Sequence, residues 1–316
     1  MRVIRFLLPA IILLFCLTAI SEAASWNSTR SAIVALKARG QAMNAYSLAV
    51  SQSVSGEDRF DRDFVAGWIA LRSLGKPDLA IKHFTEMAAA TAFLRGWKKD
   101  AGKAKAGYWL GKALSQAGRA KEAQTMFNAS AAYVTTFYGQ LSASELGRPL
   151  TRDIVSRHAE DYPVKSVYWH DSRVRLELLH AVIREESRFN QNAKSNKAAI
   201  GMMQVLDGTA KDVGKNAGVN IDTHMMRANA DYNIAVGSRY LGEQLEKYNG
   251  NPMLAAAAYN AGPARADEWL QQFGDPRGGR VDPVDWAESV PFKETRDYIQ
   301  KVVSAYLVYL AMGVSG

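Results

Sequence analysis

The sequence has one cysteine, Cys16, among its 316 residues, and it has nine prolines. A single cysteine excludes an intrachain disulfide framework and any metal or iron–sulfur site built on several thiolates. The five histidines show no metal-ligand spacing, and the sequence contains neither a His-Glu-x-x-His motif nor a glycine-rich phosphate loop. We therefore expect no metal and no cofactor, and we expect packing to hold the fold together.

Long apolar runs are also scarce, since the one near the N-terminus, residues 6–20, has no counterpart later in the chain. Arg2 and Arg5 precede this run and Ser21-Glu22-Ala23-Ala24 follow it. This order is typical of a secretory signal peptide, residues 1–23, cleaved after Ala23. The alternative is an uncleaved membrane anchor, for which the run is short of the roughly 20 residues needed. We expect an exported protein that loses its cysteine with the signal.

Neither charge sign is scarce, but lysine and arginine exceed aspartate and glutamate by 39 to 31, a net charge of +8. Cleavage would leave 37 basic and 30 acidic residues, or +7. Such an excess favours an acidic polymer, an anionic membrane or nucleic acid as a partner. Because the basic residues are scattered, and helix packing accounts for most of the aromatic ones, we expect no nucleic acid binding.

The first half of the chain predicts paired helices. Residues 24–147 are rich in Ala, Leu, Lys and Gln, and their apolar residues follow a helical period. Gly75, Ala80 and Phe84 recur with identical spacing as Gly118, Ala123 and Phe127. The repeat predicts helix–turn–helix units of an α-solenoid, in which small residues let the helices approach.

Prolines and aromatic residues in 148–172 interrupt this pattern and predict a connector. From residue 173 to residue 316, helical segments ended by Asn or Gly predict a compact second domain. Strands are hard to find anywhere, so the fold class is all-α.

One carboxylate of the second domain stands in an unusual place. Residues 176–189 predict an amphipathic helix, and Glu186 lies at the centre of its apolar face, within about 60° of Leu179, Val182, Ile183 and Phe189. Glu185 falls at the edge of that face, where water can solvate it. Burial disfavours the charged form of Glu186, so its pKa should rise and it could donate a proton near neutrality. Alternatively, Glu186 pairs with a buried arginine or caps a helix.

Four separated blocks favour the catalytic interpretation. Glu186-Ser187-Arg188-Phe189 is followed by Gly201-Met202-Met203-Gln204, then by Ala258-Tyr259-Asn260-Ala261-Gly262, and finally by the segment from Glu288 to Tyr298. In this order the blocks resemble the catalytic domain of the soluble lytic murein transglycosylases. Residues 108–111 and 136–147 resemble the end of the superhelical domain of that family.

The resemblance implies a lysozyme-like, mainly helical catalytic domain in which Glu186 is the single acid and base. It would protonate the glycosidic oxygen between N-acetylmuramic acid and N-acetylglucosamine and then accept the proton of the 6-hydroxyl, leaving a 1,6-anhydro sugar. The N-acetyl group of the substrate can stabilise the cationic centre, so no second carboxylate is required.

The resemblance also implies substrate-contacting residues around Glu186, with Ser195 donating a hydrogen bond to it, Gln204 binding sugar and Glu288 on the opposite wall. The full set is Ser195, Gly201, Met203, Gln204, Tyr259, Asn260, Glu288 and Tyr298. Three departures from the family pattern bear on the subsites: Glu185 in place of a common Gln, Ala198 in place of Gly, and Leu206-Asp207 in place of Met-Pro.

Two other functions stay open at this point. A lysozyme-type muramidase of the same fold would activate water, and a strictly inverting version would need a second carboxylate, for which Glu288 or Asp207 could serve. A non-catalytic murein-binding assembly protein would use the solenoid as its working surface. The predicted partners are peptidoglycan glycan strands and, through the solenoid, a protein of the envelope or of a secretion machine. We expect a monomer in the periplasm, associated with the cell wall.

Overall fold

The computed structural model describes residues 25–314, so the predicted signal peptide, residues 1–23, lies outside the described residues. Within 25–314 every regular element is a helix, and β interactions are limited to two isolated bridges in residues 194–205. The predicted all-α fold class is confirmed. No helix in this part of the chain is both long enough and apolar enough to cross a membrane.

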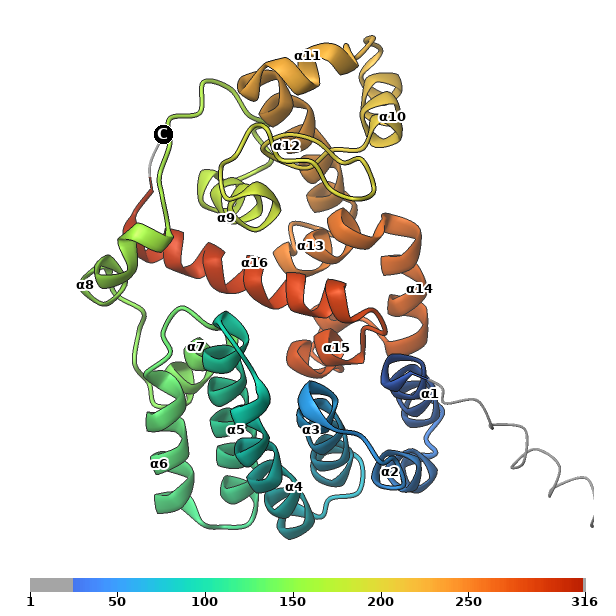
Figure 1. The fold of residues 1–316 in the computed structure, drawn as a ribbon, viewed down its shortest axis with the longest axis vertical. Helices are drawn as coiled ribbons and strands as arrows, with labels where there is room; N and C mark the ends of the chain where they lie inside the picture. The colour runs from blue at the N-terminus through green and yellow to red at the C-terminus, as the bar shows by residue number, and fades with distance from the viewer. Residues whose placement is uncertain (1–24, 315–316) are drawn as a thin grey trace, which may run out of the picture.

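The helices before residue 147 stack in chain order and occupy one half of the molecule, blue to green in Figure 1. Each packs against the next one along the chain, an arrangement consistent with the predicted solenoid. They are α1 (Trp26–Ala38), α2 (Ala42–Val50), α3 (Gly56–Arg72), α4 (Pro77–Ala90), the 3₁₀ turn η1 (Thr91–Phe93), α5 (Trp97–Gln116), α6 (Ala120–Ala131) and α7 (Phe137–Glu145).

The repeated glycines and phenylalanines explain how two of these helix pairs close. Gly75 and Gly118 have φ of 62° and 77° and make the turns after α3 and α5. Phe84 on α4 lies against Gly67 of α3, where a Cβ atom would approach the ring to 2.6 Å. Phe127 on α6 lies against Gly111 of α5 at the same distance. A side chain at either glycine would push its pair of helices apart.

The predicted connector contains short helical turns, α8 (Arg152–Val155) and η2 (Ser156–Asp161). The second group of helices follows and fills the other half of the molecule (Figure 1). It comprises α9 (Leu176–Ser187), α10 (Asp207–Ala217), α11 (Thr223–Ala228), α12 (Ala230–Lys247), α13 (Pro252–Ala261), α14 (Pro263–Phe273), η3 (Pro276–Gly278), α15 (Pro283–Ser289) and α16 (Lys293–Met312).

The long helix α16 joins the two halves. It crosses the middle of the molecule in Figure 1 and contacts α7 and α8 as well as α9 and α13. The largest hydrophobic cluster of the second half packs α9 against α16 through residues such as Leu179, Ile183, Val302 and Tyr309, each 0% exposed. The position of α9, and of every side chain on it, is therefore fixed by a close-packed core.

Candidate active site

Helix α9 carries Glu186 in its last turn, as predicted. Leu179, Val182 and Ile183 are each 0% exposed, so the predicted apolar face faces the core. The helix ends at Ser187 rather than at residue 189, because Arg188 and Phe189 take left-handed backbone conformations with φ of 52° and 62°. The Ser187 hydroxyl donates a 2.7 Å hydrogen bond to the Met202 carbonyl, which ties the end of α9 to the segment 199–205.

Glu186 has an unusual electrostatic environment. Its Oε1 accepts a 2.6 Å hydrogen bond from the hydroxyl of Tyr298 on α16, and no cation of residues 25–314 lies within ion-pair distance. Burial raises the pKa of Glu186 to about 7, the Tyr298 hydrogen bond opposes that rise, and the charges of Glu185 and Glu294 add a little to it. The carboxyl group is thus an acid that can hold its proton near neutrality.

Glu186 opens into a groove with a cavity volume of about 430 Å³. The side chains around it come from α9, from the segment 195–209, from α12 and α13, and from the start of α16. They are Glu186, Ser195, Asn196, Lys197, Ala199, Gln204, Val205, Leu206, Thr209, Tyr240, Tyr259, Asn260 and Glu294. The alcohol, amide and aromatic groups beside the Glu186 carboxyl suit a polar ligand that offers many hydroxyl groups.

Four of the predicted contact residues line this groove with Glu186. Gln204 donates hydrogen bonds to the Ala193 and Gly201 carbonyls, and the Tyr259 hydroxyl donates one to the Met203 carbonyl at 2.8 Å. Asn260 accepts a hydrogen bond from Thr295. Ser195 is the fourth, but its hydroxyl accepts from the backbone N–H groups of residues 197 and 199. The predicted bond from Ser195 to Glu186 is absent among the described residues, and Tyr298 takes that place.

Two predicted contacts are contradicted by burial. Met203 is 0% exposed, and its side chain packs against Gly237 of α12 instead of forming the floor of the groove. Gly201 is buried as well, and a Cβ atom there would come within 2.3 Å of the Asn233 side chain. Its φ of 78° gives a second reason for glycine. Both residues build the wall of the groove from behind.

The prediction for Glu288 is also wrong. This residue lies on α15, its side chain is 1% exposed, and it faces the helices of the first half rather than the groove. Lys105 Nζ is 2.6 Å and Arg30 Nη2 3.2 Å from its carboxylate, and Tyr138 and Gln300 donate further hydrogen bonds. Burial favours the neutral acid, but Lys105 and Arg30 outweigh it and hold the pKa of Glu288 below its usual value. Glu288 therefore joins the two halves of the molecule.

Glu185 was expected to be solvated by water, and the structure contradicts this. Its side chain is 10% exposed and forms ion pairs with Arg184 on α9 and Lys301 on α16. Two adjacent glutamates of one helix thus differ in their partners. Glu185 has two cations, whereas Glu186 has one hydroxyl.

Other groove residues were not predicted, because their places depend on how distant segments meet. Glu294 lies in the first turn of α16, and Tyr240 projects from α12. Leu206, which was expected to bear on the subsites, also lines the groove and is 41% exposed. The departure at Ala198 has a structural consequence: its φ of 63° is a conformation that glycine adopts more easily. Gln204 is left-handed too, at φ 47°, so the segment beside the acid holds backbone strain of the kind found at functional sites.

The helices around the groove belong in large part to a segment that a known family model covers. Residues 168–278 match the family model described as "Transglycosylase SLT domain", and the chain therefore carries a domain of this family. The predicted family is confirmed.

The chain is similar in sequence to several lytic transglycosylases. Over 130 residues it is 36% identical to "Soluble lytic murein transglycosylase" of Escherichia coli K12, a match that covers 41% of this chain and 19% of the relative. The matched segment thus spans about a fifth of the length of that relative.

Two solved structures extend the likeness at the level of the fold. An inactive mutant of the lytic transglycosylase Slt from Pseudomonas aeruginosa superposes with a TM-score of 0.54 and 23% identity, covering 87% of this chain and 61% of that one. The 70-kDa soluble lytic transglycosylase in complex with bulgecin A gives 0.56 and 19%, covering 89% and 62%. Because this coverage exceeds the matched domain, the fold likeness also includes helices of the first half.

Proposed function

We propose that this protein is a peptidoglycan lytic transglycosylase that cleaves the β-1,4 bond between N-acetylmuramic acid and N-acetylglucosamine without water and leaves 1,6-anhydro ends. The observation that carries the proposal is the environment of Glu186, an acid with a pKa raised to about 7 in a polar groove, whose one hydrogen-bond partner within residues 25–314 is Tyr298. A carboxyl group with such a pKa can both give and take a proton near neutral pH.

The reaction uses this carboxyl group twice. Protonated Glu186 gives its proton to the glycosidic oxygen, and the bond from that oxygen to C1 of N-acetylmuramic acid breaks. The carbonyl oxygen of the substrate's own N-acetyl group stabilises the positive charge left at C1. The 6-hydroxyl oxygen then bonds to C1 and gives its proton to the Glu186 carboxylate. The product is a 1,6-anhydro sugar, the enzyme regains its starting protonation state, and no water is consumed.

The groove residues support these steps in different ways. Tyr298 touches the acid rather than the sugar, so it is a positioning residue that orients the carboxyl and stabilises its charged form. The Gln204 side-chain oxygen and the Asn260 amide nitrogen offer an acceptor and donors to sugar hydroxyls, because their other polar atoms already bond to protein. Tyr259 lies beside Glu186 with its hydroxyl fixed on the Met203 carbonyl, near the site where positive charge develops.

An inverting hydrolase of the same fold would need a second carboxylate to activate water. Burial removes Glu288 from that role, and Asp207 forms an ion pair with Arg227. Glu294 lines the groove, but its side chain is 75% exposed and lies 3.8 Å from Lys197, so it is well solvated. A non-catalytic wall-binding protein is disfavoured because a partly buried acid with a raised pKa and no cation of residues 25–314 beside it destabilises the fold when it ionises, and only a catalytic use explains keeping it.

Purified sacculi provide the test. The wild type should release muropeptides with 1,6-anhydro ends, and Glu186→Gln should lose about a thousandfold in rate while it still binds sacculi. The matched control is Glu177→Gln on the opposite face of the same helix, where Glu177 pairs with Arg175, and this variant should cleave at nearly the wild-type rate. Reducing ends from the wild type would support the hydrolase, and undiminished cleavage by Glu186→Gln would refute the role of Glu186.

The same proposal places the protein in the periplasm on the cell wall, where the export signal predicted in residues 1–23 would deliver it. The net positive charge would attract it to the carboxylates of the wall's stem peptides. Binding to sacculi should then weaken as salt concentration rises.

A further inference from the structure

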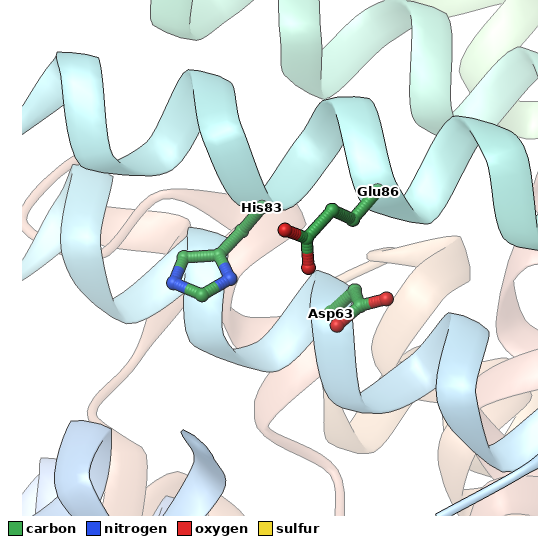
Figure 2. A group of neighbouring side chains, drawn as sticks. All are labelled: Asp63, His83 and Glu86. Atoms are coloured by element: carbon green, nitrogen blue, oxygen red, sulfur yellow. The ribbon is translucent and has the colours of Figure 1, made fainter.

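A cluster of potential metal ligands lies far along the chain from the groove, between α3 and α4. Asp63 projects from α3, and His83 and Glu86 project from α4 toward it (Figure 2). One ligand atom from each residue, a carboxylate oxygen or a ring nitrogen, can be chosen so that all three lie within 4.8 Å of one another. Asp63 and His83 lie on different helices and are 20 positions apart in the sequence, so the search for metal-ligand spacings did not predict this cluster.

The His83 ring has one nitrogen next to a hydroxyl group and the other without a partner among the described residues, an arrangement that also occurs in metal-binding histidines. Its Nε2 lies 2.8 Å from the hydroxyl of Tyr46 on α2, whereas its Nδ1 is buried and has no hydrogen-bond partner in the part of the chain that the structure describes. In Figure 2 one ring nitrogen faces the Glu86 carboxylate. When Nε2–H donates to the Tyr46 oxygen, Nδ1 keeps a lone pair directed into the protein, and a second polar partner of this kind orients most metal-bound histidines.

The position of the two carboxylates, Asp63 and Glu86, is electrostatically unfavourable. Asp63 is 0% exposed, and beyond its arginine neighbours neither of its oxygens has a hydrogen-bond partner among residues 25–314. Arg62 Nη2 lies 2.6 Å from Oδ1 and Arg59 Nε lies 3.8 Å from Oδ2. Asp63 is buried and the Glu86 carboxylate lies close to it, so the two negative charges repel each other. A cation between them would remove that repulsion.

The second helix pair shows that the fold does not need polar groups here. With the register set by Gly75 and Gly118, the positions of His83 and Glu86 correspond to Met126 and Ala129. The position of Asp63 corresponds to Ala106 in that register, or to Gly107 when the pairs are aligned on their phenylalanine contacts. The pair α5 and α6 therefore closes with small and apolar residues, whereas α3 and α4 bring a buried acid, a half-buried acid and a half-buried histidine together at the same place.

We propose that Asp63, His83 and Glu86 bind one divalent transition-metal ion, Zn²⁺ by preference, which links α3 to α4 in the first half of the molecule. One imidazole nitrogen and two carboxylate oxygens form a ligand set that Zn²⁺ accepts and Mg²⁺ does not favour, and water can complete the tetrahedron. The role is structural, and it is independent of the function proposed for the groove. The ion would stabilise the folded chain by mass action.

The test uses the full chain, stripped with a chelator and titrated with Zn²⁺ in calorimetry and thermal unfolding. We expect one saturable equivalent per chain, a rise in Tm of about 3 °C or more, and no comparable response to Mg²⁺. Glu86→Gln keeps the size of the half-buried side chain and should weaken Zn²⁺ binding by about tenfold or more, and His83→Asn should weaken it further.

The control is His224→Asn, which removes an exposed histidine on α11 and should leave Zn²⁺ binding unchanged. Circular dichroism of each stripped variant establishes that it is folded before titration. Absence of a saturable Zn²⁺ site in the wild type would overturn the proposal. The proposal would also be overturned if folded Glu86→Gln and His83→Asn bound Zn²⁺ as tightly as the wild type, because the metal would then be bound elsewhere.

Discussion

Glu186 and Glu288 are both shielded glutamates of the second half, yet their surroundings push them in opposite directions. Glu186 faces the groove with the Tyr298 hydroxyl as its partner, and its pKa rises to about 7. Glu288 lies at the junction of the two halves with Lys105 and Arg30 against it, and its pKa falls. Burial raises the pKa of both carboxyl groups, so the presence or absence of a buried cation decides the outcome.

Glu186 is therefore suited to proton transfer, whereas the negative charge of Glu288 stabilises the contact between the two halves of the molecule. A buried carboxylate with two cations stabilises the fold only as long as every member of the network is present. A shielded carboxyl group without a neighbouring cation lowers the stability of the fold when it ionises. Its presence is therefore explained by proton transfer rather than by stability. Four substitutions separate these roles.

Glu288→Gln should destabilise the protein by about 3–5 kcal/mol near neutral pH, because it leaves Lys105 and Arg30 buried beside a neutral amide. Since the pKa of Glu288 is lowered by folding, its contribution is present above pH 4.5 and is lost as the pH falls through the folded-state pKa. The penalty measured by chemical denaturation should therefore shrink in acid. Glu145→Gln, which breaks the more exposed pair with Lys112, is the control and should cost about 1 kcal/mol or less.

Glu186→Gln should have the opposite sign. The folded state holds the Glu186 proton up to about pH 7 and the unfolded state releases it near pH 4.5, so wild-type stability declines between these values. The variant escapes this decline and should be more stable than the wild type by about 3 kcal/mol at pH 8, with little difference at pH 4. Denaturant midpoints at the two pH values measure it. Equal stability at both would mean that the carboxyl is not perturbed.

Tyr298→Phe should lower the cleavage rate by about tenfold, because the carboxyl loses its orienting hydrogen bond. That bond favours the charged form, so its loss should raise the pKa of Glu186 and move the alkaline limb of the pH–rate profile upward by about one unit. Tyr306→Phe on the same helix is the control and should change neither quantity. A lower rate with an unmoved profile would assign Tyr298 a packing role only.

Glu294→Gln should have the smallest effect, less than about threefold on the rate, since Glu294 is exposed and raises the pKa of Glu186 only slightly. The rate on sacculi and the pH profile together measure it. Loss comparable to that of Glu186→Gln would make Glu294 a second catalytic carboxylate and would break the contrast between the two glutamates.

The sequence predicted Glu186 because the relevant signal is local: helical periodicity places the residue on an apolar face, and the following blocks identify the family. The same reasoning could predict the paired helices from the spacing of Gly75, Phe84, Gly118 and Phe127. It failed for Glu288, whose environment is created by residues more than 100 positions away on α1 and α5. Motif membership says which segment matters but not which way a side chain points.

Met203 and Tyr298 illustrate the same limit within the groove. Both belong to matching blocks, yet Met203 packs inward on Gly237, and the Tyr298 hydroxyl reaches Glu186 only because α16 lies against α9. The contact between these helices joins residues 112 positions apart. Periodicity predicts that each helix is amphipathic, but the register between two helices depends on the whole core.

The central claim is that one carboxyl group cleaves the glycan without water. Digestion of sacculi in ¹⁸O-labelled water, followed by mass spectrometry of the released muropeptides, tests it most directly. We expect 1,6-anhydro ends that contain no ¹⁸O, for the wild type and for Glu294→Gln alike. Reducing ends that carry ¹⁸O from the first turnovers would contradict it and would show that the groove activates water.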